Sequence, residues 1–556
     1  MGKTFILGNN TKTSWASGLG ELLTVPTFAI NDYEKVHDFV CQKIDATDET
    51  DKVIIDLDAV NPALALLIAL HIRLSVADIK TAAFVPLLFV SQLPLQSFLK
   101  YGECSQLFLM PRGTYFCMPE EVSDALEIIE GLSVDNYKSD FLSQIHISPD
   151  AEIGRHSMAN QWGADVFNRI VSKDDRVVTP EIASAKKKLY YKYVFLNTVD
   201  IKALINGNTN VDERENVRFN ATGKNILLID DEADKGWSFV LKDKFFTNGN
   251  IEVINSVIAD YNDIPDEKRK KIESDFYDLY LLDLRLLGTK EDDIYSADDF
   301  SGMKVLKEIK RINNGNQVII LTASNKAWNM KALLDAGADG YYIKESPELK
   351  LPMSFSNANF LSFKDAVEIS LNSGYKKNTF RKINGLLSKI TESNISEFTK
   401  NELEYVLNQS SKQVLSAKNS LDFAYAYMTL FQAFEFVTKE YISETETGWI
   451  LNNSTSLYRY STFGKFAKQK EEIVKVDGKN IYPSILDKII NIYVELGGYN
   501  DSAFINDYIR KSIDIRNAFI HNDTSKYSQE DTQKIYKQDG FNLLLETVEV
   551  IINSII

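Results

Sequence analysis

Residues 225–231 read NILLIDD, and this stretch decides the fold expected for the middle of the chain. Three more apolar runs follow it, namely FYDLYLLDLRLLG (276–288), QVIILTASN (317–325) and GADGYYIKESP (337–347). Patterns typical of amphipathic helices, such as GMKVLKEIKRI and NMKALLDAG, lie between these runs. Apolar strands that alternate with helices predict a doubly wound parallel sheet.

Polar residues stand where these apolar runs end, at Asp230, Asp231, Asp283, Thr322 and Lys344. In a doubly wound sheet the carboxyl ends of the strands form the ligand-binding edge, so we expect the five side chains to meet. Three adjacent carboxylates repel one another, and an Mg²⁺ ion held by their oxygens would remove that cost. A lysine and a hydroxyl beside them suit a phosphoryl group, which points to attack by a carboxylate on a phosphoryl donor.

This set of residues, in this order, closely resembles the receiver domain of two-component response regulators over about residues 223–350. The resemblance implies a flavodoxin-like domain that a sensor histidine kinase phosphorylates. It implies Asp283 as phosphoacceptor, Asp230, Asp231, Asp283 and the backbone carbonyl of Arg285 as Mg²⁺ ligands, Thr322 and Lys344 as phosphoryl contacts, and Tyr341 as the aromatic that changes rotamer. The alternative is a phosphate-free flavodoxin-like domain with incidental acids.

The acidic segment LRLLGTKEDDIYSADDFS (284–301) follows the expected phosphoacceptor and is longer than the family usually has there. It either restricts access to one dedicated kinase or forms a solvated insertion, which is the interpretation we favour.

Residues 1–145 repeat the same plan in degenerate form. TFILGNN, KVIIDLDA, PLLFVSQ and SQLFLMPRG correspond to the four runs above, with Gly8 and Asn9 in place of the acid pair and Met110 in place of the lysine. Asp56 or Asp58 could mimic the phosphoacceptor, but neither has a metal pair or a lysine. We therefore expect a pseudo-receiver that serves as a docking or dimerising platform, the alternative being an unrelated α/β domain.

A helical connector is expected over 146–222, and it contains His156 four residues before Asn160. A phosphorelay histidine is one interpretation of His156; a histidine at the start of a connecting helix is the other, and we favour it.

Beyond a linker at 351–379, residues 380–556 show apolar residues at helical spacing throughout, which predicts an all-α bundle. One late helix contains IRNAFIHND (515–523), in which Asn517 and His521 lie one turn apart and Arg516 is one step behind. An arginine that grips a phosphate beside a histidine that exchanges protons suits metal-free cleavage of RNA by its own 2′-hydroxyl. The structural alternative is an arginine paired with Asp514 or Glu435.

This R-x4-H string in a helical bundle resembles the HEPN superfamily, many of whose members are metal-independent ribonucleases. The resemblance implies that Arg516 and His521 are catalytic, that Asn517 assists, that Glu435 is the facing acid, and that two copies of the motif meet in a homodimer. Aromatic and basic residues that alternate in LYRYSTFGKFAKQK (457–470) are candidates for contacts with single-stranded RNA, namely Tyr458, Arg459, Tyr460, Lys465, Phe466 and Lys468.

The composition sets limits on these interpretations. A net charge of −16 argues against a protein that coats nucleic acid. The start of the chain lacks the layout of a signal peptide, the longest apolar run (59–70) is too short to span a bilayer, and the three cysteines lack metal-ligand spacing. We therefore expect a cytoplasmic, multidomain α/β plus all-α protein without membrane contact.

The function expected from the sequence is a kinase-controlled ribonuclease, in which phosphorylation of Asp283 governs the R-x4-H site, with Mg²⁺ in the receiver and no metal at the ribonuclease site. Family association suggests a bacterial defence or stress system. The alternative is a non-enzymatic response regulator whose helical domain mediates dimerisation or partner binding.

Overall fold

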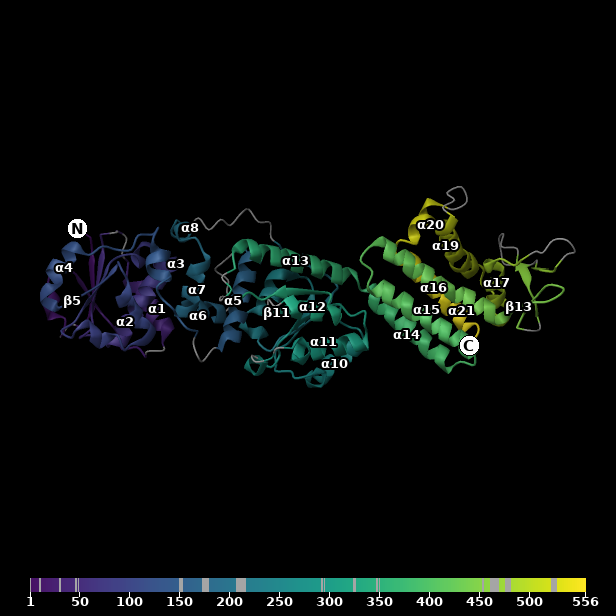
Figure 1. Cartoon of the computed structure of the whole chain (residues 1–556), viewed down its shortest axis with the longest axis horizontal. Helices are drawn as coiled ribbons and strands as arrows, with labels where there is room; N and C mark the ends of the chain where they lie inside the picture. Colours follow the sequence, from purple (N-terminus) through teal and green to yellow (C-terminus); the bar gives the residue numbers. More distant parts are fainter. Residues whose placement is uncertain are drawn as a thin grey trace. The chain divides into compact units, whose positions relative to one another are not determined.

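This computed structural model describes residues 2–9, 12–29, 32–45, 48, 50–149, 154–172, 180–206, 217–291, 294, 296–323, 327–346, 349, 351–452, 455–460, 470–475, 482–521 and 528–556 (Figure 1). The chain divides into two compact units. The first comprises Met1–Arg269, Leu279–Leu306 and Val318–Ile369, and the second comprises Lys270–Asp278, Lys307–Gln317 and Ser370–Ile556.

The N-terminal part of the first unit is a five-stranded sheet in which every paired strand is parallel. Its strands are β1 (Thr4–Gly8), β2 (Glu21–Thr24), β3 (Lys52–Asp56), β4 (Leu87–Val90) and β5 (Thr114–Cys117), in the order β2-β1-β3-β4-β5. This is the flavodoxin-like order. The accompanying helices are α1 (Tyr33–Lys43), α2 (Pro62–Leu74), α3 (Val76–Ile79) and α4 (Val122–Ile128).

Helix α2 contains most of the longest apolar run, and every residue from Leu64 to Leu74 is buried. Among the described residues no single helix is long and apolar enough to cross a membrane, although the bent pair Pro62–Leu74 and Val76–Ala83 meets the requirements of length and composition.

The fifth strand is not where the sequence predicts it. SQLFLMPRG begins inside the 3₁₀ segment η4 (Gly102–Leu109) and continues into a turn, whereas the strand is Thr114–Cys117. Leu107 is buried but Leu109 is 70% exposed, so this apolar run does not have two covered faces as a central parallel strand does. The prediction is therefore wrong by about one strand length.

The connector between the two sheets is helical, with α5 (Gly154–Val171), α6 (Pro180–Lys187), α7 (Leu189–Thr198) and α8 (Ile201–Ile205). The backbone of His156 belongs to α5, but its side chain lies outside the described residues. The two alternatives for that histidine therefore stay predictions.

A second sheet has the same topology as the first. Its strands are β7 (Asn225–Ile229), β9 (Asn250–Ile254), β10 (Leu279–Asp283), β11 (Val318–Thr322) and β12 (Gly340–Ile343), all paired in parallel in the order β12-β11-β10-β7-β9. Two short strands, β6 (Phe219–Asn220) and β8 (Phe246–Thr247), pair separately. The helices of this region are α9 (Trp237–Phe239), α10 (Asp266–Glu273), α11 (Ser301–Ile312), α12 (Ala327–Asp335) and α13 (Met353–Asn372).

Helix α13 occupies most of the segment expected to be a linker. Phe360 and Phe363 of this helix are buried and stack edge-on against Phe167 of α5. A segment that buries two aromatic rings belongs to a core rather than to an exposed connection.

The remainder of the second unit is mainly helical. Its helices are α14 (Tyr375–Glu392), α15 (Glu397–Leu415), α16 (Ser420–Tyr441), α17 (Ile485–Asn491), α18 (Ser502–Phe504), α19 (Lys511–His521), α20 (Gln529–Lys534) and α21 (Gln538–Asn553). In α16 the buried residues Tyr427, Leu430, Phe431 and Phe434 recur at i, i+3, i+4 and i+7, which fixes the face that enters the core.

This region is not purely helical, as the sequence pattern predicts it to be. Short antiparallel strands follow α16, namely β13 (Ile442–Glu444), β14 (Trp449–Leu451), β15 (Thr455–Ser456), β16 (Tyr458–Tyr460) and β17 (Lys470–Glu472). They are two or three residues long, which is too short for a period of two to be recognised in sequence.

Candidate functional site

The polar residues of the second sheet meet at the carboxyl edge of its strands. Asp230 directly follows β7, Asp283 ends β10, and Lys344 directly follows β12. The ammonium of Lys344 donates to Asp230 Oδ2 at 2.7 Å and to Asp283 Oδ2 at 2.6 Å. Thr322, the last residue of β11, is buried, and its carbonyl accepts from the backbone N–H of Lys344 at 2.7 Å. The clustering expected from the sequence is therefore present.

Burial and mutual charge set the electrostatics of this pocket. Burial raises the pKa of Asp230, and the ammonium of Lys344 opposes that shift. Burial and the neighbouring carboxylates of Asp283 and Asp230 raise the pKa of Asp231 to about 7. For Lys344, burial alone lowers the pKa, but the two aspartates outweigh burial and hold the pKa above its usual value. The pocket thus contains one firmly charged ammonium and an excess of acids.

The three acids fit a hard divalent cation. One carboxylate oxygen from each of Asp230, Asp231 and Asp283 lies within 4.8 Å of the others. Asp231 Oδ1 is buried and has no hydrogen-bond partner among the described residues, so a ligand would satisfy it. Hard oxygen ligands such as these carboxylates are the kind that Mg²⁺ binds in proteins.

The roles carried over from the receiver resemblance stay predictions, and the structure describes the surroundings of three more of these residues. The backbone N–H of Arg285 donates to Asp283 Oδ1 at 3.3 Å, while the role of its carbonyl as a metal ligand is not tested. Tyr341 is 38% exposed, as a side chain that changes rotamer needs to be, and its neighbour Tyr342 is buried. Thr322 is 1% exposed, so its hydroxyl faces the protein interior.

The acidic segment after Asp283 is folded against the pocket, at least in its first half. Glu291 is buried, and its carboxylate accepts hydrogen bonds from the backbone of Leu287 and Ser301 and from the Ser301 hydroxyl. The short 3₁₀ segment η10 (Gly288–Glu291) contacts helix α5. A solvated insertion is therefore the wrong description for residues 287–291.

Asn160 of α5 completes the pocket, and the sequence does not predict it there. Its Oδ1 accepts from Lys344 Nζ at 2.7 Å, and its Nδ2 donates to Glu232 Oε2 at 2.7 Å. No local pattern marks this residue, because its partners lie 72 and 184 positions away in the chain.

Strand register shows which residues of the N-terminal sheet match this pocket. Asp56 pairs with Val90 as Asp283 pairs with Leu321, and Val90 pairs with Cys117 as Leu321 pairs with Tyr342. The lysine therefore corresponds to a residue two positions after Cys117, and the expectation of Met110 is wrong because β5 begins later than predicted. The corresponding pairs, with the residue of the N-terminal sheet first, are Gly8/Asp230, Asn9/Asp231, Asp56/Asp283, Ser91/Thr322 and Pro119/Lys344.

In this N-terminal pocket neutral groups surround the single matching acid. Asp56 Oδ2 accepts from the indole N–H of Trp15 at 3.1 Å, and Oδ1 accepts from the backbone of Asp58 and Ala59. Asp58 instead accepts from the Ser91 hydroxyl at 2.7 Å. Of the two acids proposed as mimics, Asp56 therefore holds the acceptor position, and its carboxylate accepts from an indole N–H, whereas that of Asp283 accepts from an ammonium.

The R-x4-H residues lie on the last two turns of α19. Arg516 is partly exposed, and its guanidinium approaches Glu435 Oε1 at 3.9 Å, donates to Asn517 Oδ1 at 3.0 Å and lies 5.3 Å from the centre of the Phe431 ring. His521 is exposed at the end of the helix. The two proposed catalytic residues are therefore not locked in the interior.

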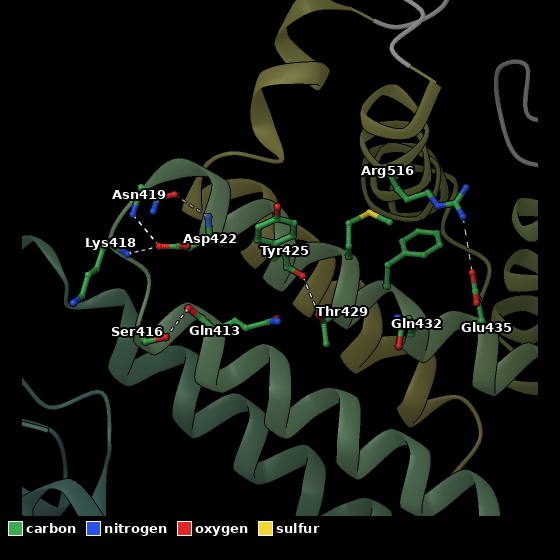
Figure 2. Close-up of a pocket in the computed structure, with 12 residues that line it drawn as sticks. Gln413, Ser416, Lys418, Asn419, Asp422, Tyr425, Thr429, Gln432, Glu435 and Arg516 are labelled. Carbon is green, nitrogen blue, oxygen red and sulfur yellow. Dashed lines mark hydrogen bonds and ion pairs between the residues drawn. The ribbon is translucent and has the colours of Figure 1, made fainter. Parts of the chain in front are cut away.

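A groove of about 650 Å³ runs along α16 to Arg516. Figure 2 shows Arg516 and Glu435 facing each other at one end, with Tyr425 and Asp422 toward the other end. Asn517 and His521 do not line this groove. The structure thus joins Arg516 and Glu435 in one cavity, and it does not place His521 there.

The residues proposed to bind RNA divide into three groups. Tyr460 is buried and its hydroxyl donates to Glu495, so its prediction as a stacking surface is wrong, since its ring belongs to the core. Tyr458 is half-buried with the Lys470 ammonium 4.1 Å from its ring centre, and Arg459 is exposed, 3.8 Å from Asp487. Lys465, Phe466 and Lys468 lie outside the described residues.

Comparison with known proteins agrees with the interpretation of the N-terminal domain as a pseudo-receiver. Residues 8–117 match a family described as "Inactive Receiver domain". A 75-residue stretch, 13% of this chain, is 40% identical to the nitrate/nitrite response regulator protein NarP of Escherichia coli (strain K12) and spans 30% of that protein. Among solved structures, a CheY-like response regulator receiver domain protein from Methanospirillum hungatei JF-1 is 22% identical, with 28% of this chain and 97% of that chain covered and a TM-score of 0.18. Residues 8–117 thus match an inactive receiver domain, and a separate comparison finds a 75-residue stretch of the chain similar to part of a response regulator.

Proposed function

We propose that this chain is a response regulator in which a sensor histidine kinase phosphorylates Asp283, and that phosphorylation controls RNA cleavage by the R-x4-H site of the helical unit. The observation that carries the first half is the buried contact of Lys344 with both Asp230 and Asp283, beside a third acid. Acids with perturbed pKa values around a single lysine identify this pocket as a candidate functional site.

The chemistry is transfer of a phosphoryl group to a carboxylate. A carboxylate oxygen of Asp283 attacks phosphorus, an O–P bond forms, and the P–N bond of a phosphohistidine or the P–O bond of an acyl phosphate breaks, with the leaving group taking the electron pair. Lys344 stabilises negative charge on the phosphoryl oxygens, and Thr322 donates a hydrogen bond to one of them. Mg²⁺, when held by Asp230, Asp231 and Asp283, supplies positive charge that neutralises the acids and the transferring group.

The helical unit supplies the second reaction. His521, exposed at the end of α19, accepts the proton of an RNA 2′-hydroxyl, and the 2′-oxygen attacks the adjacent phosphorus to give a 2′,3′-cyclic phosphate. The P–O5′ bond breaks, and the 5′-oxygen keeps the electron pair and takes a proton from water. Arg516 is partly exposed beside a groove, which suits it to hold the non-bridging oxygens of that phosphate. Two such sites brought together in a homodimer would place both motifs around one RNA strand.

A second function is favoured by specific contacts around Arg516. Its guanidinium is already engaged by Glu435, Asn517 and the face of Phe431, and the groove lining includes Arg516 without His521. These contacts suit a helical unit that dimerises or binds a partner and cleaves nothing.

Cleavage of total RNA by the purified full chain, with and without acetyl phosphate and Mg²⁺, separates the two functions. Substitution His521→Ala is expected to lower the cleavage rate by about 10²–10⁴-fold, the usual contribution of a proton-transfer group. Arg516→Ala should also lower the rate, because it removes the contact with the phosphate oxygens. His146→Ala is the matched control, because His146 is also exposed but belongs to the first unit. Equal cleavage by the His521→Ala variant would refute the ribonuclease proposal, and intact RNA in every condition would favour the binding function.

A further inference from the structure

Helix α5 covers the pocket that contains Asp283. Asp230, Asp283 and Lys344 are each at most 2% exposed, and the side chain that closes the pocket over Lys344 is Asn160 of α5, itself 1% exposed. The orientation of the Asn160 amide is set by chemistry, because Lys344 can only donate to it and the Glu232 carboxylate can only accept from it.

The same face of α5 is embedded below the pocket. A Cβ on Gly163 would lie 3.1 Å from the Trp237 ring and 3.5 Å from Cα of Lys344, so only a glycine allows this close approach without movement. One turn further, Phe167 is completely buried and makes edge contacts with Trp237 and Tyr342. Residues 160, 163 and 167 share one side of a helix, so a single rigid face lies against the pocket.

Helix α5 is also connected to the N-terminal domain, through α6 and α7. Asp165 of α5 is buried and forms an ion pair of 2.7 Å with Lys186 of α6. In α7, Lys192 is buried and donates to Ser75 at 2.7 Å, and its Nζ lies 2.8 Å from His37 Nδ1 and 3.0 Å from His71 Nδ1. The helix over the pocket is therefore connected through packed helices to the inactive receiver.

The number of hydrogen bonds that Lys344 can donate limits what the pocket can bind. An ammonium has three N–H groups, and here they meet Asp230 Oδ2, Asp283 Oδ2 and Asn160 Oδ1. A phosphoryl oxygen on Asp283 needs one of these donors, and the three added oxygens need space that the α5 face now fills. The bond to Asn160 is the one that can be given up without leaving a buried carboxylate uncompensated.

We infer that α5 is an intramolecular plug of the phosphorylation pocket, with Asn160 as its contact residue, and that docking of α5 and phosphorylation of Asp283 exclude each other. This inference rests on the proposed phosphorylation of Asp283 and names its regulation. A kinase or an acyl phosphate reaches Asp283 when α5 leaves the pocket, and the phosphorylated pocket keeps α5 displaced. Helices α6 and α7 connect α5 to the inactive receiver, which thereby holds α5 in the pocket.

The test measures phosphate incorporation into the full chain from acetyl phosphate with Mg²⁺. Asn160→Ala frees one donor of Lys344 and is expected to raise the labelling rate about tenfold, the factor that one charged hydrogen bond of ordinary strength supplies. Gln161→Ala removes the neighbouring amide, which lines a different cleft with Glu34 and Ser184, and should leave the rate unchanged. Equal rates in all three proteins would overturn the plug while leaving phosphorylation of Asp283 standing.

Amide hydrogen exchange of α5 can be measured on the wild-type chain itself. Phosphorylation of the wild-type chain is expected to speed exchange in peptides covering 160–171 by between about fivefold and 150-fold, the usual range of coupling between two sites. Asp283→Asn treated in the same way should show no change. Labelled protein with unchanged α5 exchange would overturn the inference alone, whereas no label in either the wild type or the Asn160→Ala variant would overturn the proposed phosphorylation and the plug together.

Discussion

In the sheet β7–β12 the carboxyl edge carries Asp230, Asp283 and Lys344, whereas the matching positions of the sheet β1–β5 are Gly8, Asp56 and Pro119. Both sheets have the same strand order and the same parallel pairing. Their folding is driven by buried apolar strands, which do not depend on the residues at the edge. The comparison teaches that the chemistry of such a pocket can be removed while the fold stays.

The two pockets differ in both their acids and their lysine, and electrostatics explains why these residues go together. A buried lysine without its acids would be an uncompensated charge, and two buried acids without the lysine would repel each other. In the N-terminal pocket one acid remains, and it is satisfied by the neutral indole of Trp15 and by backbone N–H groups. The two pockets thus differ in charge, because neutral N–H groups satisfy the lone acid of the first, whereas the second gathers three acids around one ammonium.

The largest expected effect compares the two acceptor aspartates. Asp283→Asn should abolish acid-labile phosphate incorporation from acetyl phosphate, because the amide cannot act as the nucleophile. Asp56→Asn should leave incorporation unchanged, since its pocket has neither the second acid nor the ammonium. Mass spectrometry of the intact chain measures both, and label that disappears with Asp56→Asn but survives Asp283→Asn would reverse the assignment of the two pockets.

The next effect compares a lysine at each pocket. Lys344→Met leaves Asp230 and Asp283 buried without their counter-ion and is expected to lower the free energy of unfolding by about 3–5 kcal/mol without Mg²⁺. Lys12→Met removes an exposed lysine whose Nζ lies 3.4 Å from the Asp58 carbonyl, and it should change stability by less than about 0.5 kcal/mol. Urea denaturation measures both variants; a cost for Lys344→Met as small as that of the control would mean that the acids are already neutral.

A smaller effect comes from the glycine that replaces the first acid. A Cβ on Gly8 would lie 2.3 Å from the Thr13 hydroxyl, so the side chain of Thr13 already fills the space that a larger residue would need. Gly8→Ala should cost about 1–3 kcal/mol of stability, as overpacking usually does. Gly385→Ala, with no atom within 4 Å of the new Cβ, should be neutral or slightly stabilising in its helix. Thermal unfolding followed by calorimetry distinguishes them, and a stable Gly8→Ala variant would show that the N-terminal pocket can still open.

The smallest effect concerns pH. The folded-state pKa of Asp231 is raised to about 7 from its ordinary 3.8, so this group binds a proton in the folded chain between those values and must lose it to bind Mg²⁺. Mg²⁺ affinity is therefore expected to rise about tenfold between pH 6 and pH 8, while the stability of the metal-free chain falls as pH rises from about 4 to 7. Calorimetric titration with Mg²⁺ measures the first trend, and Asp231→Asn should remove it. An affinity independent of pH would show that Asp231 is not a ligand.

The sequence predicts four of the five strands of the second sheet, because each of these is a continuous apolar run that ends in a polar residue. It misses β9, whose apolar run is interrupted by Glu252. It also predicts that Asp230, Asp231, Asp283 and Lys344 meet, since the carboxyl ends of parallel strands lie on one edge. It is less successful where apolar runs are ambiguous. Residues 105–110 look like a strand but form a 3₁₀ segment, and the strands after α16 are too short to be recognised.

The local sequence pattern also does not predict which individual aromatic side chains are buried. Tyr460 alternates with Arg459 in a way that suggests an RNA-binding surface, yet its ring enters the core and its hydroxyl meets Glu495, 35 positions away. The R-x4-H motif predicts Arg516 and His521 on one helix, but the contact of Arg516 with Glu435 depends on how α16 packs against α19.

Sequence alone determined two α/β segments, the loss of the acid pair at Gly8 and Asn9, and the identity of the acids and lysine in the second pocket, because these follow from hydrophobic period and residue type. The tertiary structure alone decided that Pro119 stands in the lysine's position, that Trp15 satisfies Asp56, and that α5 closes the pocket over Asp283. Such contacts join residues from 41 to 184 positions apart, and their free energy depends on packing and desolvation that no local pattern encodes.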